Sequence, residues 1–477
     1  MAALETDSKI EIYRKKFGLP LAILAGLLVW ATPIPAGLSY QGHQALALFA
    51  GIFVLYLTEA VPLAVTSLAI APMAVIMGVA KLKDGLAAFG SSSVFLMLGA
   101  FILAAAMVET NLAKRITYYI ISLVGSSTTK ITFGVMIANC ILSFLVPSST
   151  ARVAILLPVC ISIIGLFGTE GRTRFGVNLL LTLTMTTATI ASGILTGTVP
   201  NPVTLDFIVK AGGPNISYIE WLKIGFLPAF VNTFITWLII QIAFRPEEKE
   251  IPGGEAFVKK NLAEMGPMTY KEKYAGFVFA LTVILWAFGS KIKLDSTTAC
   301  LIGDLLLFMP KFGVITWKEA SKHISWNVLL IAGGGIGLGG LLMKTGASKF
   351  LAKAVFSAFG LHALPVMIIM IIVMLICQFM HFFFVGTTVM CTSMMPMVIA
   401  LSIEAGMPPQ LFAIPAGMII GGYPLLMFYC TNPNILVYGT GQLQVGDFPK
   451  VGVPISIISS IVYVLCAMTY WKWIGMY

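Results

Sequence analysis

Charged residues are scarce in this chain: Asp, Glu, Lys and Arg make up only 10% of its 477 residues. A soluble domain carries roughly 25% charge, so water could not solvate a surface of this composition. Apolar residues make up 58% of the chain, which disfavours a disordered protein, a coiled coil and a cytosolic enzyme. The composition predicts a protein that crosses a membrane many times and faces lipid over most of its surface.

Common signatures of catalysis and metal binding are also missing. The seven cysteines form no CxxC pair, so we interpret them as small apolar packing residues. No Walker A lysine motif, HExxH or GxSxG is present, so neither an ATP-driven pump nor a hydrolase has visible machinery. The net charge of +10 arises in short loops between apolar runs, where it sets membrane orientation. We therefore expect no cofactor, no bound metal and no nucleic-acid partner.

Eleven apolar stretches approach the roughly 20 residues that a helix needs to cross a bilayer. Two more, 131–167 and 364–402, are too long for one span, and each fits either two closely spaced helices or a re-entrant hairpin. Non-helical backbone at membrane depth is tolerated only where it is buried or lines a cavity, so a hairpin tip would suggest a site. The interruptions are Pro147-Ser148-Ser149-Thr150 and Gly386-Thr387-Thr388. The expected crossings lie near 18–38, 43–61, 63–80, 92–111, 177–209, 223–244, 273–290, 296–312, 326–344, 408–438 and 452–475.

One hydrophilic segment, 246–272, divides the chain almost in half. With the N-terminus inside and eleven crossings, basic residues favour the cytoplasmic side by about two to one. We therefore expect a cytoplasmic N-terminus, a cytoplasmic linker and an extracellular C-terminus. No cleaved signal or transit-like extension precedes the first span, which favours a bacterial plasma membrane.

The polar interruptions recur in the same order about 235 residues apart. Each is followed at the same distance by a proline, Pro158 or Pro396, and then by a second break about fifty residues further on. These second breaks are Gly197-Thr198-Val199-Pro200-Asn201 and Cys430-Thr431-Asn432-Pro433-Asn434. Each half has five crossings and one hairpin, and an odd number of crossings inverts the second half. Such repeats with paired broken helices indicate a secondary transporter with a site near the midplane.

The division that follows has four parts: an N-terminal segment with the first crossing (1–42), a first repeat (43–245), the linker (246–272) and a second repeat (273–477). The hairpins 131–167 and 364–402 belong to the first and second repeat.

Hydroxyl and amide groups at the interruptions suit an anionic ligand. The helix after each tip offers free N–H groups and a positive dipole end, and two tips meeting from opposite sides would enclose an anion with a carboxylate at each end. The alternative is that these residues only cap and kink helices. The predicted substrate-binding residues are Ser148, Ser149, Thr150, Arg152, Asn201, His381, Gly386, Thr387, Thr388, Thr431, Asn432 and Asn434, and the helix breaks are at Gly197, Thr198, Pro200 and Pro433. If sodium binds, we expect it near Ser149, Asn201, Thr387 and Asn434.

A few ionisable residues lie within apolar stretches. Arg152 follows the first tip directly, and a charge there costs at least a few kcal/mol unless it is compensated, which makes it a functional hypothesis by default. Its alternative is a structural pair with Glu109 or with a helix C-terminus. His381, before the second tip, is either a second positive or donor group or a satisfied core histidine. Asp206 and Asp304 are either proton-coupling acids or, as we favour, capping and interface residues.

Thr58-Glu59-Ala60-Val61-Pro62, the two tips and the two Thr-x-Pro-Asn breaks together resemble the divalent anion/sodium symporters, the INDY-type dicarboxylate and citrate carriers. The resemblance covers nearly the whole chain. It implies eleven spans with two re-entrant hairpins, a homodimer and an elevator-type movement. In that family Ser-Asn-Thr tips bind the substrate carboxylates and, with the broken helices, sodium.

Both tip asparagines of that pattern are missing here, and the chain looks more like the family's sodium-independent exchangers, such as the α-ketoglutarate/malate translocators. Arg152 could then take over the electrostatic role of sodium. Because an empty carrier would move this charge uncompensated, we predict obligatory exchange of C4 and C5 dicarboxylates (α-ketoglutarate, succinate or malate). Sodium- or proton-coupled uptake on the same fold, with Asn201, Asn432 and Asn434 holding a cation, is the alternative. An anion channel is a distant one.

Overall fold

The computed structural model describes residues 9–125, 127–146, 148–168 and 171–476. Within these ranges the chain is helical and has no β-strand, only an isolated bridge between Ser127 and Glu250. Seven helices in the described part are long and apolar enough to cross a membrane, and five shorter ones are also apolar. The prediction of an all-α membrane protein is therefore confirmed.

The elements follow one another without long irregular connections. The first half holds α1 (Lys9–Ala31), α2 (Tyr40–Thr58), α3 (Leu63–Ile76), α4 (Leu82–Ala87), α5 (Ser92–Glu109), α6 (Leu112–Val124), α7 (Thr128–Leu145), α8 (Ser149–Gly165), α9 (Arg174–Ala191), α10 (Pro200–Lys210) and α11 (Tyr218–Ala243). The linker holds α12 (Gly254–Glu264). The second half holds α13 (Tyr270–Phe288), α14 (Ser296–Leu307), α15 (Trp317–His323), α16 (Trp326–Lys344), α17 (Ala347–Ala358), α18 (Val366–Phe379), α19 (Thr387–Glu404), α20 (Pro409–Gly422), α21 (Asn432–Tyr438), α22 (Asp447–Met468) and α23 (Tyr470–Trp473).

The series α5–α11 recurs in the second half as α16–α22. The two overlong apolar stretches are the helix pairs α7–α8 and α18–α19. The expected crossings 177–209 and 408–438 are each two helices, because Pro200 and Pro433, which have no N–H to donate, stand at the start of α10 and α21. The sequence analysis missed α6 and α17, which occupy equivalent places and have the amphipathic pattern of helices that lie at a membrane surface.

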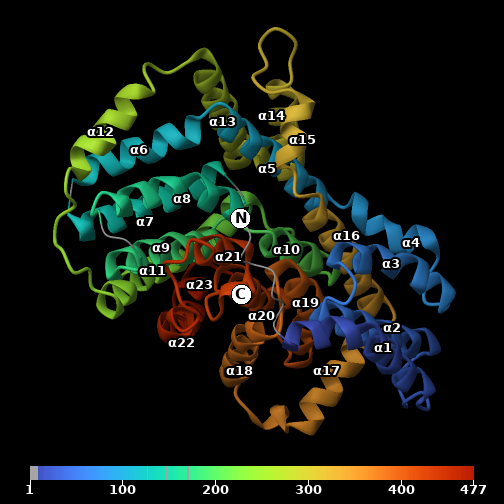
Figure 1. The fold of residues 1–477 in the computed structure, drawn as a ribbon. Coiled ribbons are helices and arrows are strands. Elements are labelled where there is room, and N and C mark those ends of the chain that lie inside the picture. Colours follow the sequence, from blue (N-terminus) through green and yellow to red (C-terminus); the bar gives the residue numbers. More distant parts are fainter. Residues whose placement is uncertain (1–8, 126, 147, 169–170, 477) are drawn as a thin grey trace.

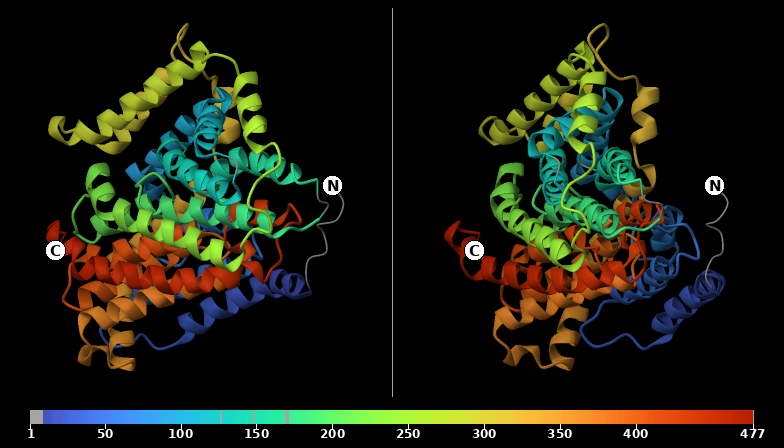
Figure 2. Two further views of the ribbon diagram at one scale, coloured as in Figure 1. Left: turned by 90° about the vertical axis from the view of Figure 1, so that its left-hand side faces the viewer. Right: turned by 60° about the vertical axis from the view of Figure 1, so that its left-hand side comes forward.

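The broken helices form the centre of the molecule. Every residue of α9 from Phe175 to Ala191 and every residue of α20 from Leu411 to Gly422 is buried. The paired helices α1 and α2 lie at one side of the bundle, and α6 and α12 lie together at the other (Figure 1). The long helices α11 and α22 run side by side through the body (Figure 2). The elements carrying the predicted breaks are therefore the ones most shielded from lipid.

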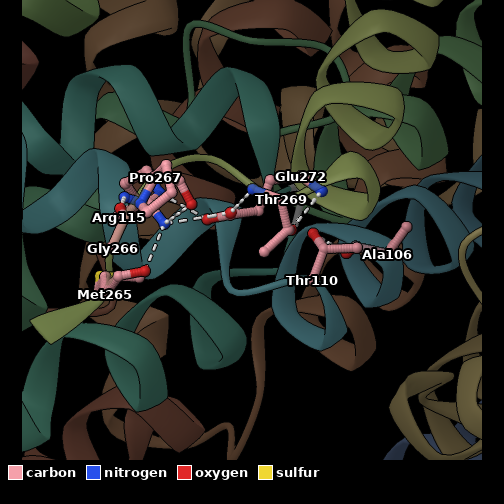
Figure 3. Close-up of polar contacts among 8 residues, drawn as sticks. All are labelled: Ala106, Thr110, Arg115, Met265, Gly266, Pro267, Thr269 and Glu272. Atoms are coloured by element: carbon pink, nitrogen blue, oxygen red, sulfur yellow. Dashed lines mark hydrogen bonds and ion pairs between the residues drawn. The ribbon is translucent and has the colours of Figure 1, made fainter.

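Arg115 at the start of α6 ties the end of the linker to the first half (Figure 3). Its guanidinium donates to both oxygens of Glu272, at 2.6 and 3.2 Å, and to the carbonyls of Met265, Gly266 and Pro267. Burial alone would raise the pKa of Glu272, but hydrogen bonds from Arg115 and Thr269 outweigh it and hold that pKa below its ordinary value. The junction between the halves is thus fixed by an ionised contact.

Candidate functional site

At each helix break, an asparagine side chain donates hydrogen bonds to backbone carbonyls of the irregular segment. The Asn201 amide nitrogen donates to the carbonyls of Ala191, Ser192 and Ile194, at and just beyond the end of α9, at 3.0, 3.2 and 2.8 Å. Its oxygen has no hydrogen-bond partner among the described residues. Because the carbonyls of Ala191 and Ile194 also accept from backbone N–H groups, the amide adds a second donor there and ties the start of α10 to the irregular segment before it.

Asn434 does the same in the second half. Its amide nitrogen donates to the carbonyls of Pro424 and Met427 at 2.8 and 3.1 Å, and its oxygen accepts from the Thr184 hydroxyl of α9 at 2.6 Å. The amide nitrogens of Asn201 and Asn434 are used structurally, which agrees with the helix-capping interpretation for these donors. Of these two amides, only that of Asn201 has an oxygen without a hydrogen-bond partner among the described residues.

Arg152 is completely buried in the first turn of α8. Its Nη1 donates to Val146 O, the C-cap of α7, at 2.7 Å, and its Nη2 donates to Ser149 Oγ at 2.9 Å and Thr187 O at 3.1 Å. Both nitrogens also lie 3.4–3.5 Å from Gly197 O. The guanidinium therefore joins the first hairpin to the first break.

No carboxylate pairs with Arg152 in the described part of the chain. Glu109, one of the two structural partners considered from the sequence, instead contacts His323 at 2.7 Å. The other, a helix C-terminus, is present as the Val146 carbonyl. The charge of Arg152 is thus hydrogen-bonded but has no counter-ion, and its Nε has no acceptor.

His381 makes the corresponding link in the second half. Its ring is buried, with Nδ1 at 2.9 Å from Gln378 O and Nε2 at 3.1 Å from Ile420 O. Cys430 Sγ of the second break lies 3.2 Å from the His381 carbonyl. A neutral ring donates from one nitrogen and a protonated ring from both. Ile420 and Thr187 are equivalent positions in the two halves, because they are separated by the same number of residues as Asn434 and Asn201. Arg152 thus links the first hairpin to the end of α9, and His381 links the second hairpin to the end of α20.

The two halves also interlock. The return helix α8 of the first hairpin packs against α21, and the return helix α19 of the second packs against α10. Cys391 Sγ of α19 lies 3.6 Å from Pro200 O and from Thr204 Oγ. Each hairpin therefore touches the broken helix of the opposite half, as a site shared between two repeats requires.

The tips themselves are less tightly bound than the breaks. Ser148 caps α8 by accepting from Ala151 N at 3.2 Å, and Gly386 precedes α19 with a φ of 111°, a backbone conformation that favours glycine. Pro147 lies outside the described residues. No hydrogen bond joins the segment 148–150 to the segment 386–388 within the described residues. The structure places Thr150, Thr387 and Thr388 in the first turns of their helices, Thr431 at the N-cap of α21, and Asn432 exposed on its first turn.

Two cavities adjoin the first break. A small one of about 10 Å³, room for about one water molecule, is lined by Thr196 and Thr198 of the break and by apolar residues of α5. A larger one of about 500 Å³ opens between the starts of α5, α11 and α14 and helix α10. Leu96 and Pro202 line both cavities, so the break lies one layer of side chains away from the larger space.

Several contacting groups were missed from the sequence. Thr187 supplies a carbonyl to Arg152 and its hydroxyl donates to Asn139 Oδ1 at 2.7 Å. Thr184 holds Asn434. Both belong to a run of threonines in α9, between 182 and 189, all of them buried. The signal was visible as an unusual density of hydroxyl groups in an apolar stretch.

A family model described as the sodium:sulfate symporter transmembrane region matches residues 14–477. The chain belongs to this family. The match confirms the resemblance to the divalent anion/sodium symporters and, with the apolar helices, an integral membrane protein with a transport role.

Curated relatives of the family match almost the whole chain. A protein named sodium-dependent dicarboxylate transporter SdcS from Staphylococcus saprophyticus is 31% identical over 94% of this chain and 89% of its own length. Dicarboxylate transporter 1, chloroplastic, from Spinacia oleracea is 28% identical over 96% of this chain and 81% of its own. A protein from Cupriavidus necator named only "Membrane protein" is 29% identical over 96% and 93%.

Two solved structures share the fold. The YdaH transporter of Alcanivorax borkumensis superposes with a TM-score of 0.54 and 11% identity, covering 98% of both chains. MtrF of Neisseria gonorrhoeae superposes with a TM-score of 0.56 and 10% identity, covering 97% of this chain and 95% of its own. At this identity the likeness shows the fold alone, and it supports the transporter-type architecture.

Proposed function

We propose that this chain carries C4 and C5 dicarboxylates, such as succinate, malate or α-ketoglutarate, across a membrane by one-for-one exchange that does not require sodium. The names of the relatives support dicarboxylates as the substrate class. The observation that carries the exchange mode is the buried charge of Arg152 between the first hairpin and the first break, without a carboxylate partner among the described residues.

Arg152 acts through its charge and not through direct contact. Its two Nη atoms are already directed at Val146, Thr187, Gly197 and Ser149, so a substrate carboxylate would find at most Nε free. At 4 Å a unit charge attracts a carboxylate by about 4 kcal/mol at an effective dielectric constant of 20. The free N–H groups and hydroxyls at the tips of α8 and α19 would supply the contacts themselves.

Exchange follows because the Arg152 charge is part of the protein and stays in the site after the substrate has dissociated. An unpaired buried charge costs several kcal/mol, which slows the return of an empty carrier by a factor on the order of 10³. A bound dicarboxylate neutralises the charge and removes this barrier. His381 would position the second tip, since it contacts the last turn of its broken helix as Arg152 does in the first half, and both of its ring nitrogens already face backbone carbonyls.

Sodium-coupled uptake is the second candidate, and the comparisons favour it over exchange. The staphylococcal relative is named sodium-dependent. The unpartnered oxygen of Asn201 is a neutral ligand of the kind that a broken helix offers to sodium. Proton coupling is the further form of this alternative.

The deciding experiment measures labelled succinate uptake into proteoliposomes. Half of the vesicles are preloaded with unlabelled succinate and half are empty, each with sodium or potassium outside. Uptake confined to loaded vesicles and indifferent to sodium supports exchange. Strong sodium-dependent uptake into empty vesicles refutes exchange and assigns the symporter, while non-saturating, voltage-driven flux assigns a channel.

We further propose the architecture that this function needs. The repeats 43–245 and 273–477, with hairpins 131–167 and 364–402, would be inverted relative to one another and joined by the cytoplasmic linker 246–272, after an N-terminal segment 1–42. A homodimer surrounded by lipid in a bacterial plasma membrane, with the N-terminus inside and the C-terminus outside, would move its transport part in an elevator-type cycle. Cysteine accessibility from each side of oriented vesicles tests the topology, and chemical crosslinking tests the dimer.

A further inference from the structure

Asp304 is a buried acid that the proposed transport site does not use. It lies in the second half of α14, its side chain is only 4% exposed, and neither carboxylate oxygen has a hydrogen-bond partner among the described residues. It does not cap a helix, since Asp295 is the N-cap of α14, so the capping interpretation is wrong for this residue. Asp206, by contrast, is paired with Lys210 at 2.7 Å.

The position that corresponds to Asp304 in the first half carries no acid. Asp304 Oδ2 and Cys300 Sγ both lie over Gly99 of α5, where an added Cβ would come within 2.7 and 2.8 Å of them. The corresponding crossing in the bundle is that of α3 with α16, where Gly334 lies against the backbone of Ser67. One turn after Ser67, at the position that corresponds to Asp304, stands Ala71, which is also fully buried. That position is therefore held by a small apolar side chain.

No donor, charged or neutral, reaches either carboxylate oxygen of Asp304 among the described residues. On its own helix, the Cys300 thiol lies one turn earlier, over the same glycine of α5. From α13, the Tyr274 hydroxyl donates to Leu306 O at 3.2 Å and the Thr282 hydroxyl to Val278 O at 2.9 Å. From α5, Gly99 lies against the carboxylate. An ionised carboxylate without a cation or donor is strongly disfavoured in such surroundings.

Two further hydroxyl groups near the first helix break are also unsatisfied in the described part of the chain. One is that of Tyr218 at the start of α11, whose ring stacks on Trp286 with centroids 4.5 Å apart. Trp286 lines the large cavity. The hydroxyls of Tyr218 and of Thr196, in the segment before α10, both lack a hydrogen-bond partner among the described residues. Thr196 in turn lines the small cavity.

From these contacts we infer that Asp304 is a proton-binding site and that transport is fast only while it holds its proton. The proton resides on a carboxyl oxygen, which makes the side chain neutral. Loss of the proton places an unpaired charge between α5 and α14, two helices that flank the first break. The inference rests on the proposed transport function for its effect on rate, but the proton itself can be observed without transport.

The first test is infrared spectroscopy of the purified full chain at neutral pH, in which the spectra of the wild type and the variants are compared. A protonated carboxyl group without hydrogen bonds gives a distinct carbonyl stretch, which we expect in the wild type and in Glu319→Gln but not in Asp304→Asn. Glu319 is a matched control because it lies outside the membrane on α15, where hydrogen bonds from the Thr316 backbone and hydroxyl hold its pKa below the ordinary value. Absence of the band in the wild type, or its persistence in Asp304→Asn, overturns the inference.

The second test measures succinate counterflow in proteoliposomes from about pH 6 to about pH 10, the range in which buried carboxyl groups titrate. Asparagine mimics the neutral acid, so we expect Asp304→Asn to keep its rate at high pH, while the wild type and Glu319→Gln slow by about tenfold or more. Asp304→Ala, which introduces the small side chain found at Ala71, should behave like Asp304→Asn if the charge and not the shape matters. Identical profiles for wild type and Asp304→Asn overturn the link to rate. A lack of succinate flux in every variant refutes the proposed function and leaves the infrared result standing.

Discussion

Replacing Arg152 with glutamine separates the charge of this residue from its hydrogen bonds. A glutamine amide can still donate to Val146 O or Thr187 O but is neutral. The guanidinium serves three backbone carbonyls and the Ser149 hydroxyl, and each buried acceptor that loses its donor costs about 1–3 kcal/mol. Arg152→Gln should therefore unfold at a lower temperature. Arg152→Lys is the matched control, because it keeps the charge with a different donor geometry.

The transport effect follows from the charge alone. Without it, the substrate loses an attraction of about 4 kcal/mol, taken at 4 Å and an effective dielectric constant of 20, so KM for succinate should rise by on the order of 10²-fold or more. The empty carrier also loses the barrier that slows its return by on the order of 10³. The ratio of net uptake into empty vesicles to uptake into loaded vesicles should consequently rise in Arg152→Gln.

The assay compares initial rates at saturating substrate in empty and loaded proteoliposomes for the wild type and both variants. Arg152→Lys should keep a low ratio even if its total rate falls. The reasoning is refuted if Arg152→Gln keeps the ratio and KM of the wild type, or if both variants lose activity equally at an unchanged ratio. Either result would reduce Arg152 to a structural link between the first hairpin and the first break.

Three further predictions concern residues around the breaks and the linker. Asn201→Asp and Asn434→Asp replace an amide donor with a carboxylate that repels the same carbonyls, and each should lower stability by about 2–5 kcal/mol; unchanged thermal unfolding in detergent would contradict this. The pKa of Glu272 is depressed in the folded protein. Its contact with Arg115 therefore stabilises the fold at pH values above the ordinary glutamate pKa of about 4.3, and this stabilisation is lost as the pH falls through the lower pKa of the folded state. Glu272→Gln should abolish the part of the acid-induced loss of stability that comes from this contact. His381→Asn leaves an amide nitrogen as the donor for the carbonyls of Gln378 and Ile420 that face the ring. We expect it to raise KM for succinate in counterflow. An unchanged KM with lowered stability would show that His381 has only a packing role.

Composition and local pattern were enough to predict the helical membrane fold, the repeat and the places where helices break. These features depend on local chemistry: an apolar run of sufficient length makes a span, and Pro200 and Pro433 cannot donate a backbone hydrogen bond, so a new helix begins at each. The recurrence of these signals at one offset was visible without any knowledge of contacts.

The roles of the polar groups at those places could not be predicted in the same way. Asn201 and Asn434 looked like ligands, but their amide nitrogens donate to backbone carbonyls of their own breaks. Arg152 had Glu109 as a candidate partner, but that carboxylate contacts His323 of α15. Asp304 looked like a capping residue, but it lies over Gly99 with no hydrogen-bond partner in the described part of the chain. A side chain's partner depends on which helices pack together across the bundle, and residues distant in the sequence supply it.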